Sequence, residues 1–243
     1  MEVYHAGLIG EEGEILLKTC QEGGVDSRYI RKTTEKSGHT IIQVDKDGQN
    51  CILLYGGANQ SITREYVDEV LSHFEKGDIL LLQNEINLLD YIIDQAYEKG
   101  MMIILNPSPY NEKLDSCDFK KISMLLLNEV EGAQVTGEKD EEKILVRLKE
   151  LYPDMQVVLT LGKDGSVYQY KDQVYRQGIF PVQAVDTTAA GDTFTGYFIS
   201  SILEGMPVDE GLKLAAKASA IAVSREGATA SIPIKVEVES VDW

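Results

Sequence analysis

Short apolar runs alternate along the chain with segments in which apolar and polar residues mix at helical spacing. Nearly continuous apolar runs of this kind are typical of parallel strands that are covered on both faces. They lie within Asp78–Gln83, Met101–Leu105, Ser123–Leu127 and Val157–Leu161. Between them the spacing predicts helices over Leu88–Glu98 and Glu141–Leu151. Strands separated by helices predict an α/β fold with a doubly wound, mostly parallel sheet.

The first third of the chain is less regular. The pattern predicts a helix over Glu11–Glu22, with Ile15, Leu16 and Cys20 on one side, and strands over Val3–Leu8, His39–Val44 and Cys51–Tyr55. Asp45-Lys46-Asp47-Gly48 predicts a hairpin turn between the last two strands. A further helix is expected over Thr63–Phe74, with Thr63 as its N-cap and Gly77 as its stop.

The last third predicts antiparallel strands over Ser166–Tyr170 and Gln173–Arg176, followed by helices over about Ala189–Leu203 and Val208–Ser224. No internal repeat and no low-complexity linker interrupts the chain. We therefore predict one domain over residues 1–243, with residues of about 25–60 as a partial β flap, or lid.

Composition narrows the possible partners. The 243 residues carry a formal net charge of −17, which argues against binding to nucleic acid or to an anionic membrane, because such partners need a basic surface. No apolar run approaches the roughly 20 residues that cross a bilayer, and the start lacks the features of a signal peptide. The three cysteines are scattered, as are the three histidines. This pattern favours reduced thiols in a cytoplasmic protein and disfavours a disulfide scaffold or a zinc site.

The stretch "AVDTTAAGDTF", residues 184–194, carries the strongest chemical signal. Ala189, Ala190 and Gly191 lack bulky side chains, so the first amides of the helix that follows can approach an anion closely. Asp192 then lies in the first turn, where a carboxylate can take the proton of an acceptor hydroxyl beside a transferring phosphoryl group. The alternative is a helix start with small residues for tight packing and an aspartate that caps.

Polar residues also follow three of the predicted strands. Asn128 and Glu131 could hold phosphate through Mg²⁺, or could form a capping box at a helix start. Thr160 and the amides near Gly162 and Gly165 could cradle the phosphates of a nucleotide, or could form a plain hairpin turn. Glu85 could bind a hydroxylated ligand, or could sit at a solvated strand end. The chain has neither a G-x-x-x-x-G-K-[ST] loop nor a G-x-G-x-x-G after a strand, so P-loop and Rossmann sites are disfavoured.

Taken together and in this order, these motifs resemble the ribokinase (PfkB) family of carbohydrate kinases. The stretches that carry the resemblance are "DTTAAGDTF", "LLLNEVEG", "TLGKDG", "LLLQNEI", "NPSP", "GGANQSIT" and "AIAVSREGATASIP". The resemblance implies an ATP-dependent kinase that phosphorylates a sugar hydroxyl, with ribose to ribose 5-phosphate as the expected reaction. It also implies Mg²⁺ and K⁺ as cofactors, and a homodimer is possible.

The resemblance assigns roles to residues of this chain. Asp192 matches the catalytic base, and Ala189, Ala190 and Gly191 match the anion hole. The nucleotide side includes Ala216, near the adenine, together with Asn128, Glu131, Thr160, Gly162 and Gly165. Glu85 matches a ligand of a sugar hydroxyl. The monovalent-cation site is matched by the carbonyls of Asp186 and Thr188, with Ala222, Arg225, Gly227 and Ser231.

The chain departs from the family at its start. Family members begin with a strand, a sugar-binding Asp and a Gly-Gly-Lys-Gly-Ala-Asn-Gln segment, and all of these precede the point at which this chain begins. We therefore expect at least one βαβ unit, roughly 30 residues, to be missing. Two alternatives to an active ribose kinase stay open: a truncated, inactive remnant that binds nucleotide, and a kinase for another sugar or a nucleoside.

Overall fold

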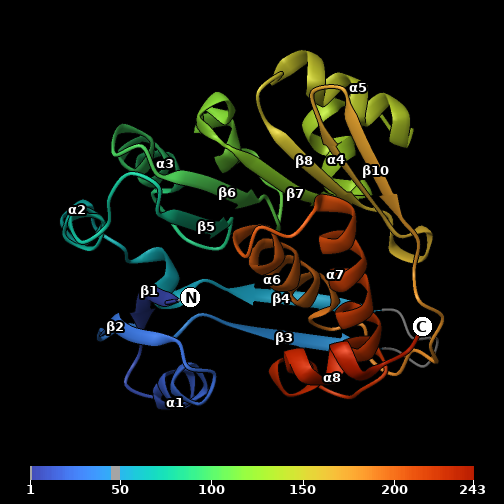
Figure 1. Cartoon of the computed structure of the whole chain (residues 1–243). Helices are drawn as coiled ribbons and strands as arrows, with labels where there is room; N and C mark the ends of the chain where they lie inside the picture. Colours follow the sequence, from blue (N-terminus) through green and yellow to red (C-terminus); the bar gives the residue numbers. More distant parts are fainter. Residues whose placement is uncertain (1, 45–49) are drawn as a thin grey trace. The chain divides into compact units, whose positions relative to one another are not determined.

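A computed structural model describes residues 2–44 and 50–243, which form two compact units that divide between residues 122 and 123. The expected turn at residues 45–48 lies outside the described residues. Both units combine helices with parallel strand pairs, which confirms the expected α/β class (Figure 1).

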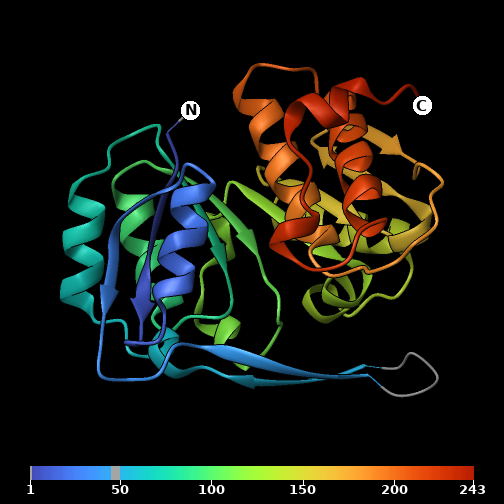
Figure 2. The same ribbon diagram turned by 90° about the horizontal axis from the view of Figure 1, so that it is seen from below.

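The described residues of the first unit form three strand pairs. β1 (Tyr4–Ile9) and β2 (Asp26–Lys32) are parallel, as are β5 (Ile79–Gln83) and β6 (Met102–Asn106). β3 (His39–Val44) and β4 (Asn50–Tyr55) form an antiparallel two-stranded ribbon, visible in Figure 2. The helices of this unit are α1 (Glu14–Glu22), α2 (Arg64–Ser72) and α3 (Leu89–Glu98).

Helix α2 contacts the β1–β2 pair of the same unit through the side chain of Tyr66. Its N-cap, Thr63, accepts a hydrogen bond from the Tyr66 amide at 3.2 Å, as the sequence predicts. The Tyr66 hydroxyl donates to the carbonyl of Gly7 in β1 at 3.3 Å. The helix ends at Ser72 with His73 as its C-cap, so the predicted stop at Gly77 is wrong. Gly77, at φ 98°, instead allows the turn before β5.

Two parts of the first unit differ from the sequence pattern. Strand β2 was not predicted, because "DSRYIRK" is mostly polar; the guanidinium group of Arg28 lies over the Tyr4 ring at 5.5 Å instead of in the core. Helix α1 begins at Glu14 and not at Glu11, and it buries none of its residues. Its supposed apolar side is open, with Ile15 70% exposed. Local periodicity therefore indicated a helix here but not a buried face.

The second unit contains four strands and five α-helices among its described residues. β7 (Met124–Asn128) and β8 (Gln156–Thr160) are parallel, and β9 (Ser166–Tyr170) and β10 (Gln173–Gln177) continue the sheet as antiparallel strands, as predicted. The helices are α4 (Glu129–Thr136), α5 (Glu141–Leu151), α6 (Ala190–Leu203), α7 (Val208–Val223) and α8 (Lys235–Ser240).

Helices cover both faces of this second sheet. Neighbouring residues of a strand point to opposite faces. In β9, the Gln169 side chain donates to the carbonyl of Leu145 in α5 at 3.0 Å, while the Tyr168 ring lies 6.1 Å from the Phe198 ring of α6. The residues buried between sheet and helices are mostly apolar and include Leu125, Val158, Leu159, Phe198 and Leu212. The loops at the carboxyl ends of β7 and β8 remain at the rim, where α/β proteins place their ligands.

Candidate active site

The start of α6 is open to solvent. Its N-cap, Ala189, takes a left-handed conformation at φ 61° and offers no side-chain cap to the first amides. A side chain built at Gly191 would meet no atom within 4 Å, and Asp192 in the first turn is exposed. The space beside Gly191 is therefore open to an anion, and the helix dipole favours negative charge at this end. The structure thus places the four predicted residues 189–192 together at one accessible helix end.

The loop before α6 is held by the carboxylate of Asp186. Its Oδ1 accepts from the Thr188 amide at 2.9 Å, and its Oδ2 accepts from the Gly227 amide at 3.0 Å. Hydrogen bonds from Thr188 and from the Gly227 amide lower the pKa of Asp186 below its ordinary value. Sequence reasoning assigned only the carbonyl of Asp186. The sequence did contain a signal for the side-chain contact with Thr188, because an aspartate two residues before a backbone amide is typical of an Asx turn.

The segment after α7 lies against this loop. Ala222 and Ser231 are fully buried, and the Ala222 carbonyl accepts from the Arg225 amide at 3.0 Å. The Arg225 side chain pairs with Glu237 at 2.8 Å. Gly227, at φ 92°, brings its amide to Asp186. The residues expected around a monovalent cation thus come from the loop before α6, the last turn of α7 and the segment that follows α7.

Asn128 and Glu131 form a complete capping box at the start of α4. The Asn128 Oδ1 accepts from the Glu131 amide at 2.9 Å, and the Glu131 Oε2 accepts from the Asn128 amide at 3.0 Å. Glu131 is only 6% exposed, whereas Asn128 is exposed. The structure therefore contains the capping box that the sequence offered as the alternative to an Mg²⁺ site. It does not exclude a second role, because a carboxylate has more acceptor positions than one amide uses.

Thr160 lies beside Asn128, because the two residues are register partners at the carboxyl ends of β7 and β8. The Thr160 hydroxyl donates to the Leu127 carbonyl at 3.4 Å. The turn that follows has Gly162 at φ 52° and Gly165 at φ 95°. The Gly165 amide donates within the turn to the Gly162 carbonyl at 3.3 Å, as the hairpin alternative expects. A side chain at Gly162 would meet nothing within 4 Å, so this side of the turn is open.

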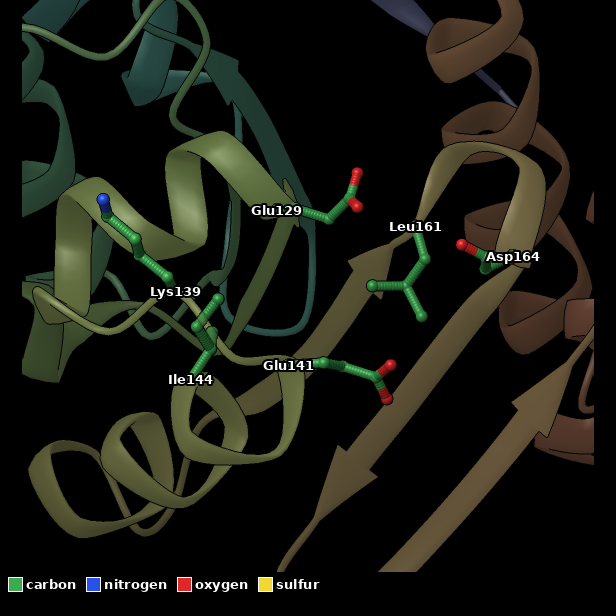
Figure 3. Close-up of a pocket in the computed structure, with 6 residues that line it drawn as sticks. All are labelled: Glu129, Lys139, Glu141, Ile144, Leu161 and Asp164. Atoms are coloured by element: carbon green, nitrogen blue, oxygen red, sulfur yellow. The ribbon is translucent and has the colours of Figure 1, made fainter.

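A pocket of about 110 Å³ is lined by residues from the start of α4, from the start of α5 and the loop before it, and from the turn after β8. Figure 3 shows the carboxylates of Glu129, Glu141 and Asp164 around the Leu161 side chain, with Lys139 also in the lining. Arg176 forms an ion pair with Glu141. Since the lining has more carboxylates than ammonium groups, a phosphate would enter this region more favourably together with a cation.

The remaining predicted residues lie elsewhere. Ala216 is on α7 and is partly buried. Glu85 follows β5 in the first unit and is exposed, and its carbonyl accepts from the Gln60 side chain at 2.7 Å. Gln60 in turn accepts from Lys113 at 2.8 Å.

Within the described residues no group of three or more His, Cys, Asp or Glu is arranged to hold a metal ion. No described helix is long and apolar enough to span a membrane.

Comparison with known proteins identifies the family of the chain. The family model described as pfkB family carbohydrate kinase matches residues 2–235. The chain is 32% identical over 232 residues to a ribokinase of Haemophilus influenzae, an alignment that covers 93% of this chain and 76% of that relative. The chain therefore belongs to the pfkB family of carbohydrate kinases, and it is a kinase.

Solved structures extend the similarity to the fold. A ribokinase of Thermotoga maritima superposes with a TM-score of 0.82 at 31% identity, covering 98% of this chain and 80% of that one. A ribokinase of Arabidopsis thaliana, solved with ribose and ATP, gives a TM-score of 0.82 at 30% identity and covers 98% and 81%. The ribokinase-like α/β fold expected from the sequence is thereby confirmed.

Proposed function

We propose that this chain transfers the γ-phosphoryl group of ATP to a hydroxyl of ribose, giving ribose 5-phosphate and ADP. The observation that carries the proposal is the open start of α6, where uncapped amides and an exposed carboxylate, Asp192, share one turn. Similarity to ribokinases, one of them solved with ribose and ATP, supports the choice of substrates.

The proposed chemistry follows from the residues of that turn. Asp192 takes the proton of the acceptor hydroxyl as its oxygen forms a bond to the γ-phosphorus. The bond from the γ-phosphorus to the bridging oxygen breaks, and ADP leaves with the electron pair. The amides of Ala190 and Gly191 stabilise the negative charge on the transferring group, because helix N-terminal amides are fixed donors that need little reorganisation.

Two cations would assist this turn, and the residues present suit them. Glu131 and Asn128 would hold Mg²⁺ through their oxygens or through water, which neutralises phosphate charge. The carbonyls of Asp186 and Thr188 would hold K⁺, with the segment from Ala222 to Ser231 completing the site. The two hydrogen bonds of Asp186 already order these loops, so a cation there would stabilise an existing conformation.

The nucleotide and the sugar would use different residues. Thr160, Gly162 and Gly165 would face the phosphates, and Ala216 would lie near the adenine. Glu85 would accept a hydrogen bond from a sugar hydroxyl. All the nucleotide residues belong to the second unit, and Glu85 belongs to the first.

A coupled assay of ADP release with ATP, Mg²⁺, K⁺ and ribose tests the proposal. We expect turnover in the wild-type chain and a kcat at least about 10²-fold lower in Asp192→Asn, because the general base is lost. Asp209→Asn is the matched control, since Asp209 also lies in the first turn of a helix, α7. An unchanged kcat in Asp192→Asn removes the proposed role of Asp192.

The same assay separates the alternatives. Binding of ADP without turnover on any acceptor would indicate a nucleotide-binding remnant. Turnover with another sugar or a nucleoside, but not with ribose, would keep the kinase and change its substrate.

We also propose that two copies of the chain pair through the β3–β4 ribbon. Register partners Ile41 and Leu53 are each 54% exposed, and Leu54 is 57% exposed. Adjacent exposed apolar residues of this kind mark interaction surfaces. Sedimentation velocity should give a dimer for the wild-type chain and a monomer for Leu53→Glu, and a wild-type monomer would contradict the proposal.

A further inference from the structure

Helix α7 makes a direct polar contact with the open end of α6. The Ser219 hydroxyl donates to the carbonyl of Ala190, the first residue of α6, at 3.0 Å. The two residues are 29 positions apart in the sequence. Helices α6 and α7 lie side by side in both views, so this contact belongs to an extensive helix interface (Figures 1 and 2).

The contact matters because it restrains the first residue of α6 directly, whereas the hydrogen bonds of Asp186 order the loop before it. Ala189 provides no side-chain cap, and its left-handed conformation is unfavourable for a residue other than glycine. The Ala190 amide reaches the Thr187 carbonyl at 3.3 Å, a long hydrogen bond. Uncapped helix ends fray readily. A hydrogen bond from a neighbouring helix therefore restricts where the first turn can lie.

Ser219 occupies a particular place on α7. It lies three residues after Ala216, and residues three apart share one face of a helix. Its hydroxyl bonds to a carbonyl of the neighbouring helix α6. The same stripe of α7 thus carries both the residue expected near the adenine and the hydroxyl that holds the anion-binding turn.

We propose that Ser219 is a positioning residue, whose hydroxyl fixes the first turn of α6, and with it Gly191 and Asp192, relative to α7. The proposal rests on the function proposed above. Its consequence is kinetic: a misplacement of about 1 Å at reacting groups can cost roughly 10²-fold in rate without a comparable loss of ground-state binding.

Steady-state kinetics with ATP and ribose test this role. Ser219→Ala should lower kcat about 10-fold, while the KM for ATP and the Kd for ADP change less than about 2-fold, and Ser219→Thr should restore kcat because it keeps the hydroxyl. The matched control is Ser201→Ala, which removes a buried α6 hydroxyl that bonds only to Phe198 of its own helix at 2.7 Å. An unchanged kcat in Ser219→Ala, or an equal loss in Ser201→Ala, overturns the proposal.

Amide hydrogen exchange gives a readout that needs no activity. Ser219→Ala should speed exchange of the amides at residues 190–193 about 10-fold, and Ser201→Ala should leave them unchanged. If the wild-type chain does not turn over ribose but exchange responds in this way, the proposed acceptor fails while Ser219 keeps its positioning role. If exchange in Ser219→Ala equals that of the wild-type chain, the positioning role fails whatever the substrate.

Discussion

The carboxylate of Asp186 accepts a hydrogen bond from the amide of Gly227, 41 residues further along the chain, at 3.0 Å. Its other oxygen accepts from the Thr188 amide at 2.9 Å. One side chain thus joins the loop that precedes α6 to the loop that follows α7. The loops on which the proposed anion and cation sites depend are connected through this carboxylate.

Asp186→Asn should destabilise the protein in a pH-dependent manner. The pKa of Asp186 is lowered in the folded chain, first by its hydrogen bonds with Thr188 and then by the one from Gly227. The contribution is therefore complete above the ordinary pKa of 3.8 and is lost as the pH falls through the lower folded value. Melting temperatures should differ between wild type and variant at pH 7 and converge toward pH 3.

The control for this series is Asp172→Asn. Asp172 pairs with Lys149 at 3.0 Å, but its side chain is 98% exposed, and such surface pairs contribute little. A gap for Asp186→Asn that stays constant from pH 7 to pH 3 would mean that the carboxylate charge is not the cause.

Two variants of Glu131 separate its capping role from the proposed Mg²⁺ role. Glu131→Gln keeps an oxygen that can accept from the Asn128 amide, so the free energy of unfolding should fall by less than about 1 kcal/mol. Glu131→Ala loses that cap and should cost about 1–2 kcal/mol. If the charge also holds Mg²⁺, the Mg²⁺ concentration at half-maximal activity should rise in both variants. A rise in Glu131→Ala alone would indicate capping only.

Gly165→Ala should be strongly destabilising. Gly165 lies at φ 95°, and a side-chain carbon there would approach the Gln177 carbonyl of β10 to 2.0 Å. The strain and the displaced strand together should cost at least about 2–3 kcal/mol. Gly162→Ala is the control, because φ is 52° but the surrounding space is open, so about 1 kcal/mol is expected. Urea denaturation measures both, and equal losses would contradict the steric explanation.

Cys117 should resist alkylation in the folded protein. Burial raises its pKa to about 11, so about one thiol in a thousand is ionised at pH 8. Peptide mapping after iodoacetamide treatment should show Cys117 modified at least about 100-fold more slowly in the native than in the urea-unfolded chain. Similar rates in the two states would show that the region around Cys117 opens freely.

Patterns of nearby residues predicted several elements with the bounds that the structure shows, including strands β3 and β9 and helix α5. Each has a local signal, either an alternating or continuous apolar run or a capped, amphipathic segment. Strand β2 lacked such a signal, because its arginines lie over tyrosine rings contributed by β1 and α2. The open side of α1 was equally hidden, because periodicity does not show what an apolar stripe will contact.

For the proposed site, the sequence by itself determined that small residues and Asp192 begin a helix and that Asn128, Glu131 and Thr160 lie at or just after strand ends. Those facts depend only on neighbours along the chain. Only the tertiary structure decided that Asn128 lies beside Thr160, that Asp186 reaches Gly227 and that Ser219 holds Ala190. Such contacts join residues far apart in sequence. They depend on strand register and on how α6 packs against α7, which no local pattern encodes.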